Sequence, residues 1–301
     1  MNSDKGIADR AIGALLGLAV GDAVGTTLEF QERDTYEPQT DMVGGGPFDL
    51  DAGQWTDDTS MALALADSLD GADDLDERDL LRRFVEWRDQ GTNSCVGFCF
   101  DIGTATNQAL NRWEKSGDPH SGSTDSQSAG NGSLMRLAPV AIRFWKDRIK
   151  LRDVAARQSK TTHAAPEAVA ACVAFAEMLA DAIEGRSRSD VLRIRPEAYA
   201  GRIGEIMKGS WRGKKRDQIR ASGYVAHTLE AAIWSVGEAE DYRSTVLIAA
   251  NLGEDADTTA AVAGQLAGAL YGASGIPVSW VSRLAWSDRI RNKAFSLLSL
   301  D

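Results

Sequence analysis

Two short segments, far apart in the chain, each combine two carboxylates with a hydroxyl. The six residues are Thr56, Asp57 and Asp58 in the first segment and Asp255, Asp257 and Thr258 in the second. Each group stands at the start of a helical pattern of apolar residues. Hard oxygen ligands of this kind suit Mg²⁺, Mn²⁺ or Ca²⁺. Two such helix starts that face each other would hold a pair of divalent ions.

Helix capping is the alternative explanation for both segments. Ser, Thr and Asp in a first helical turn accept hydrogen bonds from free backbone N–H groups and complement the positive end of the helix dipole. One such residue satisfies a helix start, whereas each segment offers three. Like charges this close repel each other unless a cation lies between them. From the residues alone, metal binding and capping both remain open.

The elements that must position these residues are helices. Apolar residues recur at helical spacing in many segments, while alternating β-branched runs are nearly absent. The expected helices span residues 6–28, 57–70, 77–90, 101–115, 136–147, 151–158, 166–184, 222–236, 241–250, 257–272 and 287–299. Small residues in 11–25 and 260–273 would let helix backbones approach closely. We therefore predict an all-α, compact bundle without an internal repeat.

Three segments are predicted to be loops, namely 31–55, 116–132 and 185–221. The third is unlike the rest of the chain, because residues 186–220 contain eleven Lys or Arg against four Asp or Glu, a net charge of +7. Two explanations of this basic segment remain open. It is a solvated charged excursion or a pair of surface helices, or it is a docking surface for an acidic protein partner.

Composition limits the classes of partner and compartment. The chain has 301 residues, is 43% hydrophobic and carries a net charge of −11, so nucleic acid is not an expected partner. Three Cys and three scattered His residues give neither a disulfide framework nor a structural zinc site, which indicates a reducing, cytoplasmic setting. The apolar run 11–21 has acidic flanks and about eleven residues, so we expect neither secretion nor a membrane span.

Taken together, six segments resemble the ADP-ribosylglycohydrolase family, the enzymes related to dinitrogenase reductase-activating glycohydrolase. In the family's order they are GLAVGDAVGTTLEF (17–30), WTDDTSMALALADSL (55–69), CFDIGTAT (99–106), GNGSLMRLAPVAI (130–142), THAAPEAVAAC (162–172) and NLGEDADTTAAVAGQLAGALYG (251–272). The resemblance extends over nearly the whole chain. It implies one domain over residues 1–301, an orthogonal helical bundle of this family's type with a binuclear site for Mg²⁺ or Mn²⁺.

The resemblance also implies roles for individual residues. The implied metal ligands are the six residues of the two acid clusters, Thr56, Asp57, Asp58, Asp255, Asp257 and Thr258. Glu29 matches the acid on a mobile segment that guards the ribose site, and Asp101 matches an acid on the acceptor side. Glu254 departs from the family's pattern, in which a second Gly is common at this position, and we assign it no role.

Substrate binding is implied for a glycine-rich turn and two further residues. These are Gly130, Asn131, Gly132, Ser133, His163 and Tyr224. The backbone N–H groups of the turn would face the ADP-ribose diphosphate or its adjoining ribose. Each residue also has a structural explanation: the turn would be a plain loop, His163 a locally satisfied hydrogen-bonding group, and Tyr224 part of the core.

The expected activity is hydrolysis of the glycosidic bond between ADP-ribose and a modified side chain, most often arginine in relatives of this pattern. A carboxylate-rich pocket can stabilise the oxocarbenium character that develops on the ribose, with Glu29 or another carboxylate as acid or base. We expect a monomer that acts on ADP-ribosylated protein. The alternatives are a protein that binds and neutralises an ADP-ribosyltransferase, and a hydrolase of small ADP-ribose conjugates or of serine-linked ADP-ribose.

Overall fold

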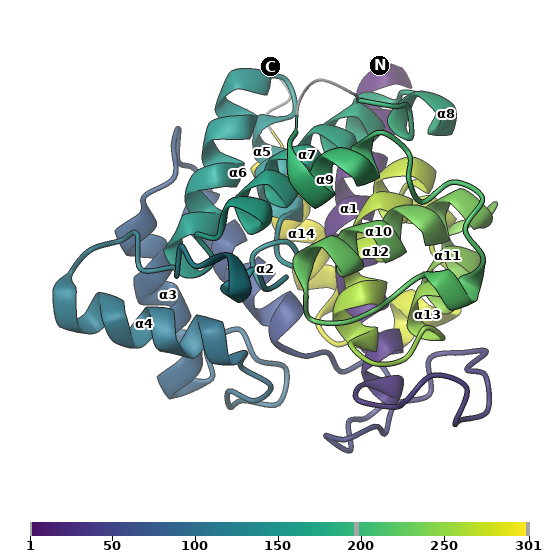
Figure 1. Ribbon diagram of the computed structural model, residues 1–301, viewed down its shortest axis with the longest axis horizontal. Coiled ribbons are helices and arrows are strands. Elements are labelled where there is room, and N and C mark those ends of the chain that lie inside the picture. The colour runs from purple at the N-terminus through teal and green to yellow at the C-terminus, as the bar shows by residue number, and fades with distance from the viewer. Residues whose placement is uncertain (1, 196–198, 299–301) are drawn as a thin grey trace.

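Helix α1 (Asn2–Gly25) and helix α12 (Ala256–Tyr271) pack against each other along their lengths at the centre of the molecule (Figure 1). The computed structural model describes residues 2–195 and 199–298. Four glycines of α1 recur every fourth residue and face the backbone of α12. A Cβ at Gly17 would lie 2.4 Å from the Gly264 carbonyl oxygen, and one at Gly25 would lie 2.4 Å from that of Ala256. The two helices are therefore antiparallel, and the end of α1 lies beside the start of α12.

The remaining helices surround this pair. They are α2 (Asp57–Leu69), α3 (Glu77–Gln90), α4 (Thr104–Ser116), α5 (Ala138–Phe144), α6 (Arg148–Thr162), α7 (Pro166–Glu184), α8 (Arg188–Val191), α9 (Gly201–Met207), α10 (Val225–Glu238), α11 (Tyr242–Ala250), α13 (Val278–Arg283) and α14 (Ser287–Leu297). Short 3-10 turns lie at Thr26–Leu28, Ser126–Ser128, Arg216–Gln218 and Ala273–Gly275. No strand occurs in residues 2–195 and 199–298, so the all-α prediction is confirmed. One hydrophobic core joins residues from Ala11 to Leu298.

Several predicted helix bounds differ from the structure. Helix α1 ends at Gly25, because the chain tightens into a 3-10 turn before Glu29. Helix α6 is longer than expected, since Asp147 caps its start by accepting from the backbone N–H groups of Ile149 and Lys150. Helix α13 was missed because a six-residue helix shows too little apolar periodicity.

The apolar run 11–21 lies inside helix α1. The stretch Asp4–Leu28 is long and apolar enough, by length and composition, to cross a membrane, and 89% of its apolar window is buried inside the protein. A core helix passes the same test, and the close packing of α1 on α12 accounts for this composition.

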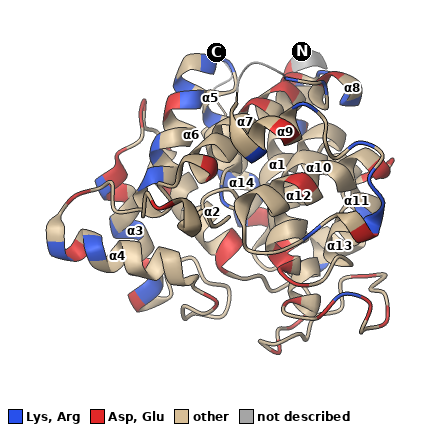
Figure 2. Cartoon of the chain, viewed as in Figure 1, with Lys and Arg blue, Asp and Glu red and all other residues tan. Residues whose placement is uncertain are grey.

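The basic segment 186–220 is not a loop throughout, since it contains α8, α9 and a 3-10 turn. Its cations largely bond to the protein itself. Buried Asp181 of α7 forms ion pairs with Arg148, Arg186, Arg193 and Arg195. Buried Glu230 of α10 pairs with Lys214 at 2.6 Å. Figure 2 shows basic and acidic positions close together on the ribbon near α8. These contacts favour a structural role for the segment over a docking surface.

Candidate metal centre and active site

The two acid clusters lie together, although 197 positions separate Asp58 from Asp255. The start of α2 meets the start of α12. Thr56 Oγ1 lies 3.2 Å from Asp257 Oδ2, and Thr258 Oγ1 lies 3.3 Å from Asp58 Oδ2. The oxygen atoms of the two clusters therefore form one polar centre inside the protein.

Capping does not explain these clusters. Thr56 and Asp255 are the N-cap residues of α2 and α12, yet neither side chain makes a capping hydrogen bond. Asp22 instead accepts from the backbone N–H groups of Thr56 at 2.9 Å and Thr59 at 3.0 Å. Glu29 Oε2 accepts from the N–H groups of Ala256 at 2.8 Å and Asp257 at 3.4 Å. Within the clusters, Asp257 Oδ1 accepts from the N–H of Thr258 at 2.7 Å. Because Asp22 and Glu29 accept from the other bonded N–H groups of the helix starts, most carboxylate oxygens of the clusters are left for another partner.

Asp22 is a site residue that the sequence analysis missed. It is fully buried and receives hydrogen bonds from both the backbone and the hydroxyls of Thr56 and Thr59. Burial, followed by the charge of Asp257, raises the pKa of Asp22 to about 7. The signal for it was an acid inside the apolar pattern GLAVGDAVG, where a charge needs a partner.

The centre concentrates negative charge without a neutralising side chain. Among the described residues, no Lys or Arg forms an ion pair with its carboxylates. Burial, followed by neighbouring carboxylates, raises the pKa of Asp57 and Asp58 well above the ordinary range and that of Asp255 to about 7. Asp58 Oδ1 is buried and has no hydrogen-bond partner. These residues fit bound cations.

A set of three acids strengthens this fit. Glu29, Asp255 and Asp257 can each offer a carboxylate oxygen such that the three atoms lie within 4.8 Å of one another. Hard divalent ions such as Mg²⁺ and Mn²⁺ prefer oxygen ligands of this type. Glu29 is thus part of the acid centre, and its side chain is buried.

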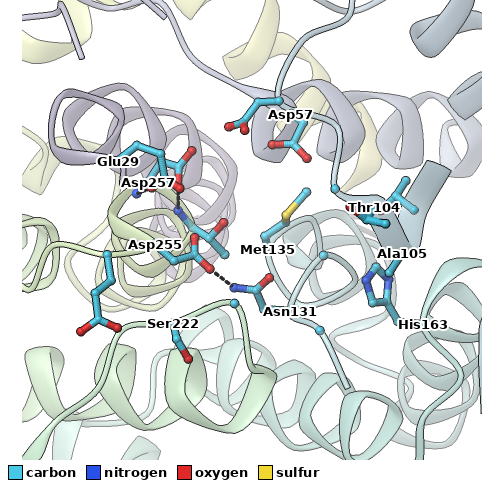
Figure 3. Close-up of a pocket in the computed structure, with 18 of the residues that line it drawn as sticks. Glu29, Asp57, Thr104, Ala105, Asn131, Met135, His163, Ser222, Asp255 and Asp257 are labelled. Carbon is cyan, nitrogen blue, oxygen red and sulfur yellow. Dashed lines mark hydrogen bonds between the residues drawn. The ribbon is translucent and has the colours of Figure 1, made fainter. Parts of the chain in front are cut away.

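A cavity of about 580 Å³ opens beside the acid centre. Glu29, Asp255 and Asp257 lie at one side of it and His163 lies at the opposite side, while Asp57 lies at the top of the view (Figure 3). Asp101 also lines the cavity, and burial followed by the charge of Asp257 raises its pKa to about 9. The cavity thus places an acid-rich wall opposite a polar, largely uncharged one.

The glycine-rich turn forms part of the uncharged wall. Gly130, Asn131 and Gly132 line the cavity. A Cβ at Gly132 would lie 2.7 Å from the ring of His163, so a larger residue would displace that ring. Asn131 Nδ2 donates to Asp255 Oδ2 at 2.7 Å and thereby connects the turn to the acid centre.

Two of the predicted substrate-binding residues lie outside the cavity lining. Ser133 is fully buried, and its Oγ lies 2.8 Å from Ser159 Oγ in the core between α6 and the turn. The Tyr224 hydroxyl donates to the Glu167 carboxylate, and Tyr224 is not among the residues that line the cavity. Ser222 and Gly223 line the cavity in its place. Ser133 and Tyr224 are therefore not part of the lining of this cavity, and substrate binding by them stays a prediction.

Glu254 has a structural role at the cavity wall. Its φ of 60° is in the left-handed region, which is uncommon for a residue with a side chain. Its backbone N–H donates to the Gln31 carbonyl at 2.8 Å, and its carbonyl accepts from the Phe30 N–H at 2.7 Å. This two-way pairing holds the segment that follows Glu29 against the start of α12. The conformation explains why glycine is common here in the family's pattern.

The fold and the site define a class of protein, an all-helical protein with an acid-rich centre that can bind metal beside a cavity. The model of the ADP-ribosylglycohydrolase family matches residues 3–300. The chain therefore belongs to the ADP-ribosylglycohydrolase family, whose members are hydrolases.

Individual relatives support this assignment. The ADP-ribosylarginine hydrolase Tri1 of Pseudomonas putida (strain GB-1) is 48% identical over 296 residues, which cover 96% of this chain and 78% of the relative. The ADP-ribosyl-[dinitrogen reductase] glycohydrolase of Rhodospirillum rubrum is 32% identical, with 97% of this chain and 96% of the relative covered. A solved structure described as an ADP-ribosylglycohydrolase-related protein complex has a TM-score of 0.86 and 37% identity, and covers 97% of this chain and 98% of its own.

Proposed function

We propose that this protein is a metal-dependent hydrolase that removes ADP-ribose from modified arginine side chains. The observation that carries the proposal is the meeting of two acid clusters, from the starts of α2 and α12, at one cavity. The similarity to proteins named ADP-ribosylarginine hydrolase supports arginine as the acceptor.

The residues that would hold divalent ions are those of the two acid clusters, Thr56, Asp57, Asp58, Asp255, Asp257 and Thr258. Such ions, when bound, orient the hydroxyls of a sugar and make a water more acidic. The ribose that is bonded to the modified side chain would lie against the acid-rich wall of the cavity. The uncharged wall, with Gly130, Asn131 and His163, would receive the diphosphate or the adjoining ribose.

Carboxylates of this chain would serve the bond cleavage in two ways. Their negative charge stabilises the positive charge that develops on the ribose as its bond to the arginine nitrogen breaks. Glu29 and Asp101 line the same cavity and are the residues to which we assign proton transfer to or from the reacting groups. The products would be ADP-ribose and an unmodified arginine side chain.

We further propose Mg²⁺ or Mn²⁺ as the ions, a monomer as the active form, an ADP-ribosylated protein as the substrate and the cytoplasm as the location. The oxygen-only ligand set supports the choice of ions. The cysteine usage supports the location. An additional role as the binding partner of an ADP-ribosyltransferase is not favoured, because most cations of the basic segment bond within the described part of the chain.

A substrate panel tests the proposed activity. Purified protein is incubated with peptides that carry ADP-ribose on arginine, serine or asparagine, with Mg²⁺, with Mn²⁺ or with a chelator, and released ADP-ribose is measured. We expect release from the arginine peptide only when metal is present, and loss of release by at least about 100-fold in Asp257→Ala. Asp217→Ala, which removes an exposed acid of the basic segment, is the control and should retain full activity. Full release in chelator, or preference for the serine peptide, would contradict the proposal.

A further inference from the structure

A chain of buried polar groups begins at Arg136, a fully buried cation without an ion-pair partner among the described residues. Its Nε donates to Gln158 Oε1 at 3.0 Å, and its guanidinium lies 4.5 Å above the centre of the Phe84 ring. Its Nη2 donates to Thr162 Oγ1 at 2.9 Å. These contacts hold the guanidinium in one orientation, and a guanidinium only donates hydrogen bonds.

The next link is Thr162, whose Oγ1 lies 2.8 Å from Nδ1 of His163. Because Arg136 donates to this oxygen, the single hydroxyl hydrogen of Thr162 must go elsewhere. Nδ1 of His163 is the acceptor that it reaches among the described residues. A hydrogen on Nδ1 would instead leave the buried Thr162 hydroxyl hydrogen without an acceptor, which is costly. The network therefore makes Nδ1 an acceptor.

The other ring nitrogen of His163 faces the cavity. His163 lines it and is 4% exposed, and no hydrogen bond within the described residues uses Nε2. A Cβ at Gly130 or Gly132 would lie 3.2 Å from Nε2, so this atom lies at the glycine-rich turn. Burial, followed by the charge of Arg136, lowers the pKa of His163 to about 3, which keeps the ring neutral near pH 7. A neutral ring that accepts at Nδ1 carries its hydrogen on Nε2.

We propose that Arg136 and Thr162 are positioning residues that fix His163 in the Nε2–H tautomer, so that the ring donates a hydrogen bond into the substrate cavity. The matching ligand group is an acceptor oxygen, such as a phosphate or hydroxyl oxygen of ADP-ribose. The choice of ADP-ribose rests on the proposed function, whereas the tautomer follows from the hydrogen bonds alone. Neither Arg136 nor Thr162 lines the cavity, so their effect on the ligand passes through His163.

Nitrogen NMR tests the tautomer directly. The full-length protein is prepared with ¹⁵N-labelled histidine, and long-range ¹H–¹⁵N correlations are recorded between about pH 5 and pH 8. The chain has three His residues, so His163→Gln assigns the signals of His163 by their disappearance. We expect a protonated nitrogen at Nε2 and an unprotonated one at Nδ1 throughout this range. A hydrogen on Nδ1 in the wild type would overturn the proposal.

Three variants separate positioning from stability. Thr162→Val preserves shape and removes the hydroxyl, so the Nε2–H fraction should fall, whereas Thr162→Ser should restore it. Thr161→Val is the matched control, because the Thr161 hydroxyl also accepts from Arg136, at 3.3 Å, but does not contact His163. It should lower thermal stability without a change of tautomer. An unchanged tautomer in Thr162→Val, or an equal change in Thr161→Val, would overturn the proposal.

Binding and turnover complete the test. Calorimetry with ADP-ribose should show a Kd weaker by about three- to tenfold in Thr162→Val and near the wild-type value in Thr162→Ser and Thr161→Val. If the wild type hydrolyses no linkage, the proposed function fails, while the NMR and ADP-ribose binding still decide this inference. A changed tautomer with unchanged ADP-ribose affinity would overturn the assigned donation to the ligand.

Discussion

At the scale of single residues, the site depends on two carboxylates, those of Asp22 and Glu29, that lie outside the two acid clusters. The acid clusters are the segments whose residue types indicate a metal site. Asp22 and Glu29 accept the hydrogen bonds of the free N–H groups at the starts of α2 and α12. Without them, the residues of the clusters would be drawn into capping. Many acids are therefore buried in one place, because some accept hydrogen bonds from the helix starts while others remain available to bind cations.

Glu254 leads to a prediction about stability. Glu254→Gly should be tolerated, with a change in unfolding free energy within about 1 kcal/mol, because glycine adopts a φ of 60° readily. Glu254→Val should destabilise by at least about 1 kcal/mol, since a β-branched residue is strained there. Chemical denaturation of both variants measures the difference. Equal stability of the two variants would show that the backbone conformation does not govern this position.

Local patterns made part of the site predictable from sequence. Thr56–Asp58 and Asp255–Thr258 were found because carboxylates and hydroxyls at helix starts are a short-range signal, and the resemblance to a family extended it. The position of Ser133 and Tyr224 outside the cavity lining could not be predicted, because the direction of a loop side chain depends on distant partners, here Ser159 and Glu167. Asp22 was missed because its partners lie 34 to 37 positions away.

At the scale of elements, the glycines of α1 determine where the acid centre forms. They let α12 approach so closely that the end of α1 brings Asp22 and Glu29 to the starts of α2 and α12. The small residues predicted this close approach, since helices without side chains at their contact can pack backbone to backbone. Which helix each would pack against could not be predicted, because that pairing joins residues more than 200 positions apart.

Gly21→Ala tests the role of this contact. A Cβ at Gly21 would lie 2.2 Å from the Ala260 carbonyl oxygen, so the helices must separate. We expect destabilisation of at least about 2 kcal/mol, measured by urea unfolding. Gly103→Ala is the control, because its nearest neighbour would be 3.9 Å away and its φ is −60°. A stability loss in Gly21→Ala no greater than that in Gly103→Ala would contradict this account.

At the scale of the whole molecule, buried carboxylates gather in two kinds of surroundings, one without paired cations and one with them. The acid centre collects carboxylates without cations, whereas Asp181 and Glu230 collect the cations of the basic segment. The carboxylates of the acid centre need cations from solution to balance their charge, whereas Asp181 and Glu230 are balanced by Lys and Arg of the same chain. The excess of positive charge is visible in the sequence, whereas its partners are not, because Asp181 and Glu230 lie on the flanking helices α7 and α10.

Asp181 makes stability depend on pH. Burial alone would raise the pKa of Asp181, but hydrogen bonds and charges from Arg195 and Arg193 outweigh burial and hold its pKa below the ordinary value. The paired form therefore adds stability above the unfolded-state pKa of about 4, and this stability is lost as pH falls through the folded-state pKa. Thermal unfolding of the wild type and Asp181→Asn from about pH 7 to pH 3 should show Tm curves that converge at low pH. A constant difference between them would contradict the ion-pair role.

The central claim is that two clusters 197 positions apart form one metal centre. Calorimetric titration of metal-free protein with Mn²⁺ tests it most directly, with the wild type, Asp58→Asn and Asp255→Asn compared at one pH. Since each cluster supplies ligands, we predict that either substitution weakens Mn²⁺ binding by at least about tenfold, while Asp217→Asn leaves it unchanged. Wild-type Mn²⁺ affinity in either Asp58→Asn or Asp255→Asn would contradict the shared centre.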